Sequence, residues 1–169
     1  MTRSLIVLAA AYLPMVLEAG RSRANERALR TMGAVEPPHD VYRVMQVAYP
    51  ACFAAIGAEA WLRDAPLDRW FAAGAAVFAG AKALKYWAIA ALGERWTFRV
   101  LVLPGAPLVV SGPYRWLRHP NYVAVVGEIA GAALMARAPI AGAAAAIAFS
   151  ALMLRRIGVE ERALNGCER

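Results

Sequence analysis

Apolar residues form five long runs along this chain, separated by polar segments. The runs cover residues 4–20, 45–62, 70–92, 122–136 and 139–154. An apolar helix of about 20 residues is long enough to cross the hydrocarbon core of a bilayer. The last two runs are shorter, and only Arg137 and Ala138 separate them, so we expect a helical hairpin that is tilted or extended by neighbouring residues. The pattern predicts an all-α fold, a transmembrane bundle of about five spans followed by a C-terminal helix.

The composition agrees with this prediction. Of the 169 residues, 60% are hydrophobic and 18% are charged, whereas soluble domains are about half apolar and about a quarter charged. So apolar a chain is not intrinsically disordered. Two cysteines are too few for a disulfide framework, and two separate histidines predict no metal site. We expect one integral membrane domain covering residues 1–169.

The net charge of +7 raises the question of a nucleic-acid partner. Most of the arginines, however, lie in three polar segments on one predicted side of the membrane. They are Arg21, Arg23, Arg27, Arg30, Arg43, Arg95, Arg99, Arg115, Arg118, Arg155, Arg156, Arg162 and Arg169. The other side carries Arg3, Arg63, Arg69 and Arg137. The positive-inside rule then places the N-terminus outside and the C-terminus in the cytoplasm. No basic patch is interleaved with exposed aromatic residues, so we expect no nucleic-acid binding.

Residues 93–122, between the third and fourth runs, contain too many prolines and glycines to form one continuous helix. These include Pro104-Gly105, Pro107, Gly112-Pro113 and Pro120. We therefore predict a folded cytoplasmic loop. It ends with Arg115, Arg118 and His119 just before a helix whose first turns expose unpaired N–H groups, an arrangement that favours anion binding. The alternative is a membrane-surface anchor in which Trp116 and Tyr122 lie at the interface.

Several short strings in this half of the chain carry a resemblance to a known family. Ser111-Gly112-Pro113-Tyr114-Arg115, Arg118-His119-Pro120-Asn121-Tyr122 and Glu128 resemble the signature of the isoprenylcysteine carboxyl methyltransferase family of integral membrane enzymes. Residues 156–164, with an acidic pair, are similar to the segment after that family's last helix, and the resemblance is strongest over residues 82–164. Asn25-Glu26-Arg27 and Gly33-Ala34-Val35-Glu36 look more like a short bacterial branch whose members O-methylate alkylresorcinols or alkylpyrones.

The resemblance implies methyl transfer from S-adenosylmethionine, held between the last helices and the cytoplasmic loop, to a lipophilic acceptor that enters from a bacterial inner membrane. The cofactor-binding residues it implies are Trp87, Gly112, Pro113, Tyr114, Arg118, His119, Pro120, Tyr122, Glu160 and Glu161. Arg118 and His119 would hold the cofactor carboxylate, and Glu160 or Glu161 would accept hydrogen bonds from its ammonium group or ribose. An aromatic residue, Tyr122, Trp87 or Trp96, would shield the sulfonium or pack against the adenine.

Charged residues inside the predicted spans are a second, independent signal. Lys82 and Lys85 lie on one face of the third span, and Glu128 lies about two turns into the fourth. Burying such groups in lipid is costly, so they should face one another or a hydrated cavity. They form either a structural ion pair or part of a substrate pocket in which Glu128 or a nearby residue removes the proton of a phenol or enol. A carboxylate acceptor would need no base.

We predict an O-methyltransferase with Glu128 and Arg118 as catalytic residues. Its acceptor carries a carboxylate or a phenol or enol hydroxyl, and the resemblance to the short bacterial branch favours the hydroxyl. The alternative is a non-catalytic transporter or assembly protein with an intramembrane charged path. A transporter of this kind predicts discontinuous helices and an internal repeat, and the sequence shows neither.

Overall fold

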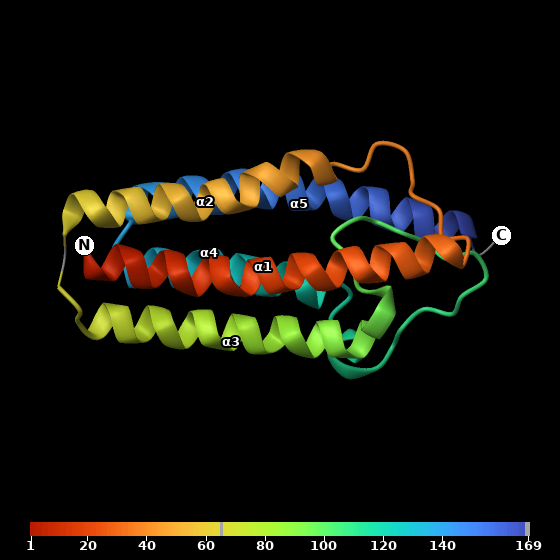
Figure 1. Cartoon of the computed structure of the whole chain (residues 1–169), viewed down its shortest axis with the longest axis horizontal. Helices are drawn as coiled ribbons and strands as arrows, with labels where there is room; N and C mark the ends of the chain where they lie inside the picture. The colour runs from red at the N-terminus through yellow and green to blue at the C-terminus, as the bar shows by residue number, and fades with distance from the viewer. Residues whose placement is uncertain (65, 168–169) are drawn as a thin grey trace.

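The computed structural model describes residues 1–64 and 66–167, which fold into a bundle of five α-helices (Figure 1). The helices are α1 (Thr2–Thr31), α2 (Tyr42–Arg63), α3 (Arg69–Leu92), α4 (Pro120–Ala136) and α5 (Pro139–Cys167). Two short 3₁₀ helices, η1 (Gly93–Arg95) and η2 (Gly112–Arg115), interrupt the segment between α3 and α4. The predicted all-α bundle is confirmed. Arg169, which we counted with the arginines of the tail, lies outside the described residues.

Three of the helices, α1, α3 and α5, are long and apolar enough to cross a membrane. Helix α4 is a shorter apolar helix of 17 residues. Helix α2 packs against α1, α4 and α5 in the same bundle. Arg137, with φ of 50°, follows α4, and α5 begins two residues later at Pro139. The predicted hairpin between the last two helices is therefore present.

Two helices extend beyond the apolar runs that predicted them. Helix α1 continues past Gly20 to Thr31, and α5 continues past Leu154 to Cys167. Hydropathy marks only the part of a helix that lipid or protein covers, whereas backbone hydrogen bonding continues through the polar turns. These extensions lie at the end of the bundle formed by residues 32–41 and 93–119, which we call the loop end (Figure 1).

Helices α3 and α4 pack against each other most closely, through glycines. A Cβ atom on Gly74 would lie 2.3 Å from the backbone nitrogen of Met135, and one on Gly131 would lie 2.6 Å from that of Phe78. In lipid, helices associate by such close packing because no hydrophobic expulsion drives them together. This contact sets the positions of the charged residues of α3 relative to α4.

Candidate functional site

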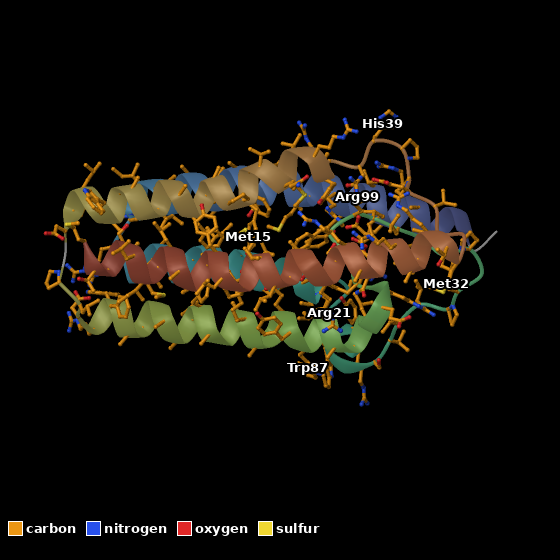
Figure 2. All side chains as sticks on the ribbon, viewed as in Figure 1. Met15, Arg21, Met32, His39, Trp87 and Arg99 are labelled. Atoms are coloured by element: carbon orange, nitrogen blue, oxygen red, sulfur yellow. The ribbon has the colours of Figure 1, made fainter. Side chains whose placement is uncertain are left out.

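A cavity of about 820 Å³ is lined by the loop end and by the helices beneath it. Charged and aromatic side chains of residues 95–99 and 114–122 and of the last turns of α5 line it, together with apolar residues 100–103 and 106–110 of the loop. Further into the bundle the lining is largely apolar and includes Met15, Val125 and Phe149. Met15 lies between α1 and α2 in Figure 2. The cavity therefore suits a ligand whose polar group lies near the charged residues and whose apolar chain lies further into the bundle.

Side chains of α1 hold the segment after α3 in place above this cavity. The side-chain amide of Asn25 donates a hydrogen bond to the carbonyl oxygen of Trp96, with a nitrogen to oxygen distance of 2.7 Å. The hydroxyl oxygen of Ser22 accepts a hydrogen bond of 2.8 Å from the backbone N–H of Phe98. The Asn25 motif singled out in the sequence thus shapes one wall of the cavity.

A second contact joins residues 32–41 to the same segment. Val35 and Val102 form an antiparallel β-bridge. Beside it, the Glu36 carboxylate accepts hydrogen bonds from Arg30 at 2.5 Å and from Arg99 at 2.6 Å (Arg99 is labelled in Figure 2). Burial raises the pKa of the Glu36 carboxyl group, but the hydrogen bonds from the two arginines outweigh burial and hold the pKa below its usual value. Glu36 therefore stays ionised and ties the segment to α1.

The two motifs of the sequence signature meet at the polar part of the cavity. Nε2 of His119 lies 3.4 Å from a carboxylate oxygen of Glu161, and Nδ1 lies 3.9 Å from one of Glu160. Tyr122 donates its hydroxyl hydrogen to Glu160 at 2.7 Å. Arg156 donates to the hydroxyl oxygen of Tyr122 at 3.0 Å. All of these residues line the cavity, so the fold brings the start of α4 together with the polar extension of α5.

Two more of the predicted cofactor-binding residues also line the cavity. The side chain of Arg118 is exposed, and that of Tyr114 is partly buried. Burial, reinforced by the charge of Glu160, raises the pKa of the Tyr114 phenol above its ordinary value, so it remains a neutral hydroxyl group. Pro113 and Pro120 are buried beside these residues and fix the backbone at both ends of the turn that carries Arg118.

Trp87 and Gly112 contact each other outside the cavity. Trp87 is not among the cavity-lining residues, and Figure 2 shows it on the side of α3 that faces away from the other helices. Its ring packs against Trp116, with ring centroids 5.8 Å apart. A Cβ atom on Gly112, whose φ is 59°, would lie 3.2 Å from the indole nitrogen of Trp87. These two residues support η2, and the aromatic side chains that face the cavity include Tyr122 and Trp96.

Beneath the cavity, four charged residues from three helices form what we call the charge cluster: Glu18, Lys82, Lys85 and Glu128. Nζ of Lys82 lies 2.9 Å from Glu18 and 3.0 Å from Glu128. Nζ of Lys85 lies 2.7 Å from Glu18 and 3.3 Å from Glu128. The hydroxyl group of Tyr49 on α2 also donates a hydrogen bond to Glu128. Two positive and two negative charges are thus paired where each would be costly alone.

The cavity borders the charge cluster at Lys85 and at Tyr49, the hydrogen-bond partner of Glu128. Tyr49 and Lys85 are among the lining residues, whereas Glu128, with 1% of its surface exposed, is not. Glu128, which we predicted as a catalytic base, therefore lies behind Tyr49. Its role as a base stays a prediction, and the hydrogen bond from Tyr49 connects it to a residue that lines the cavity.

Three residues of this region were missed in the sequence. Glu18 carried a usable signal, because a carboxylate inside an apolar run requires a partner. Tyr49 carried none, since buried tyrosines are common in helical cores. Asn121 belongs to the signature but had no assigned role, and its side-chain oxygen is buried in the cavity wall without a hydrogen-bond partner among the described residues. A buried oxygen of this kind is available to a ligand donor.

Known proteins are similar to this chain over the region that contains most of the site residues. Residues 73–166 match the isoprenylcysteine carboxyl methyltransferase family. The chain is 31% identical to the uncharacterized protein YpbQ of Bacillus subtilis over 160 residues, which is 95% of each chain. It is 25% identical to an uncharacterized protein of Haemophilus influenzae over 142 residues, which is 83% of each chain. No solved structure matches it.

Proposed function

This chain belongs to the isoprenylcysteine carboxyl methyltransferase family, and we propose that it transfers a methyl group from S-adenosylmethionine to an oxygen atom of a lipophilic acceptor. The family and the long apolar helices point to a membrane methyltransferase. The observation that carries the finer proposal is the meeting of His119, Tyr122 and Glu160 in one cavity that also has an apolar interior.

The side chains at the polar part of the cavity suit the charges of S-adenosylmethionine. Arg118 is exposed to the cavity and supplies a cation for the carboxylate, and His119 lies beside it. Glu160 and Glu161 supply acceptors for an ammonium group or for ribose hydroxyls. The unpartnered oxygen of Asn121 supplies a further acceptor in the same wall. When bound, the cofactor provides an electrophilic methyl group on a sulfonium.

The apolar interior would hold the chain of the acceptor. Val125 and Phe149 line it, and two of the helices around it, α1 and α5, are long and apolar enough to cross a membrane. The acceptor oxygen belongs to a carboxylate or to a phenol or enol, and we favour the hydroxyl. Methyl transfer is an in-line displacement, so the protein contributes mainly by holding the two reactants in line. We also propose an inner-membrane location with the loop end in the cytoplasm, where the cofactor is available.

Calorimetric titration of the detergent-purified protein with S-adenosylmethionine and S-adenosylhomocysteine tests this function. We expect saturable binding that weakens in Arg118→Ala by on the order of 1.5–3 kcal/mol, or about 10- to 150-fold, because a charged hydrogen bond is lost. Arg115→Ala is the matched control, since Arg115 lies over the ring of Trp116 and is not a lining residue. Absence of binding in folded protein would contradict the proposal, and equal losses in both variants would remove Arg118 from the site.

A further inference from the structure

Tyr49 is the residue through which the cavity meets Glu128. Its ring packs against Phe53 and Phe149 with centroids 5.1 Å away in each case, so its orientation is fixed. Its hydroxyl group donates to Glu128, which is itself held by both lysines of the charge cluster. Nζ of Lys85 lies 5.3 Å from the centroid of the tyrosine ring. Tyr49 therefore lines the cavity beside Phe149, and its hydroxyl group is hydrogen-bonded to a carboxylate that does not line the cavity.

Tyr49 lines the same cavity as Tyr122, which lies at its polar part. Tyr122, at the polar part, and Glu128 are six residues apart on α4, which corresponds to a rise of about 9 Å along the helix. An acceptor whose chain occupies the apolar part and whose oxygen points to the polar part would place that oxygen between Tyr122 and Tyr49. The reacting group would then be within reach of Tyr49 and out of reach of Glu128.

Methylation of a hydroxyl acceptor requires a base beside the acceptor oxygen. A phenol with a pKa near 10 is ionised to only about one part in a thousand at pH 7. Its oxygen becomes an effective nucleophile when the proton leaves as the new bond forms, which requires a positioned base. Among the residues of the charge cluster and its hydrogen-bond partner, Tyr49 and Lys85 reach the cavity, and the hydroxyl group of Tyr49 already has a proton acceptor behind it.

We propose that Tyr49 relays the proton of the acceptor hydroxyl to Glu128; this inference rests on the proposed function. The acceptor oxygen forms a bond to the methyl carbon while the bond between that carbon and sulfur breaks, leaving its electron pair on sulfur. The acceptor proton passes to the oxygen of Tyr49 as the tyrosine proton passes to Glu128. The proton later returns through Tyr49 to water in the cavity. Tyr49 is thus a catalytic residue, and Glu128 acts through it.

The experiment compares two acceptors in the variant Tyr49→Phe, which keeps the packed ring and removes the hydroxyl group. The first acceptor is a 5-alkylresorcinol, and the second is a halogenated alkylphenol acidic enough to be ionised at the assay pH. With the resorcinol we expect the rate of methyl transfer to fall about 100-fold or more, in the range of general-base effects. With the ionised phenol we expect a rate within about threefold of wild type, because no proton has to be removed.

Tyr12→Phe is the matched control. The hydroxyl group of Tyr12 donates to the carbonyl oxygen of Pro50 at 2.8 Å, one residue from Tyr49, but Tyr12 does not line the cavity. We expect this variant to methylate both acceptors at the wild-type rate. We also expect calorimetry to give the wild-type affinity of Tyr49→Phe for S-adenosylmethionine, which a disturbed fold would not preserve.

The outcomes separate this inference from the function on which it rests. Equal losses with both phenols, or no loss with the resorcinol, would overturn the role of Tyr49. A wild-type protein that methylates N-acetyl-S-farnesylcysteine but neither phenol would overturn it too and leave the proposed function standing. A folded wild-type protein that binds no cofactor would contradict the proposed function itself.

Discussion

Tyr122 donates its hydroxyl hydrogen to Glu160 at 2.7 Å, although 38 residues separate the two in the chain. Tyr122 lies in the first turn of α4, and Glu160 lies in the extension of α5 beyond its apolar run. Arg156, about one turn before Glu160, donates to the same hydroxyl oxygen at 3.0 Å. A single hydroxyl group thus orients one acidic and one basic side chain of the cavity wall.

Removing this hydroxyl group should weaken cofactor binding. In Tyr122→Phe, Glu160 and Arg156 lose the group that orients them, and we expect the affinity for S-adenosylmethionine to fall about tenfold or more by calorimetry. Tyr86→Phe is the control, because Tyr86 is exposed on α3 and does not line the cavity. An unchanged affinity in Tyr122→Phe would show that the orientation of Glu160 does not matter for binding.

Replacing one lysine of the charge cluster should destabilise the bundle. Lys82→Met leaves Glu18 and Glu128 with one positive charge between them in the protein interior. Breaking a buried ion pair from one side costs about 3–5 kcal/mol. We expect a loss of this size in the free energy of unfolding, measured by equilibrium unfolding in mixed micelles.

The double variant Lys82→Met with Glu18→Gln tests the cause of that loss. It removes one charge of each sign, so we expect part of the stability to return. A loss below about 1 kcal/mol in the single variant, typical of solvated pairs, would show that the cluster is hydrated.

A methyl group at the contact between α3 and α4 should also be costly. A Cβ atom on Gly74 would lie 2.3 Å from the backbone nitrogen of Met135, and backbone cannot rotate away as a side chain can. We expect Gly74→Ala to lose about 1–3 kcal/mol of stability, seen as a lower Tm in detergent. In Gly80→Ala, on the same helix, the added carbon has no atom within 4 Å beyond the neighbouring residues and backbone of its own helix, so this variant should be neutral or stabilising. Equal Tm values for the two variants would contradict the close packing.

The stabilisation of residues 95–102 by the Glu36 carboxylate should depend on pH. The fold lowers the pKa of Glu36, so its contribution is fully present above the unfolded pKa of about 4.3 and is lost as the pH falls through the folded pKa. We therefore expect Glu36→Gln to speed hydrogen exchange of these amides at pH 7. At a pH below the folded pKa of Glu36, we expect the same amides to exchange equally fast in Glu36→Gln and in wild type.

Glu94→Gln serves as the control for this comparison, because Glu94 lies in η1 near the same segment but is exposed. It should exchange like wild type at both pH values. Wild-type exchange in Glu36→Gln at pH 7 would show that the bridge between Val35 and Val102 holds the segment without the carboxylate.

The sequence by itself determined the helical membrane bundle and the final hairpin, and it marked Arg118 and His119 before α4 as candidates for anion binding. These follow from local rules: apolar runs require burial in lipid or protein, and proline and glycine between runs end helices. The same rules required Lys82, Lys85 and Glu128 to find partners, because buried charge is costly wherever it lies. The resemblance to a family added the acidic pair Glu160 and Glu161 to the expected site.

Only the tertiary structure decided which side chains meet. Hydropathy could not show that α1 continues to Thr31 or that Asn25 holds the segment after α3, because both depend on contacts between distant residues. Nor could it place Tyr49 between the cavity and Glu128, since that arrangement requires α2 and α4 to pack side by side. Sequence patterns show which residues of each segment must be buried. The packing of the helices determines which other residues they contact.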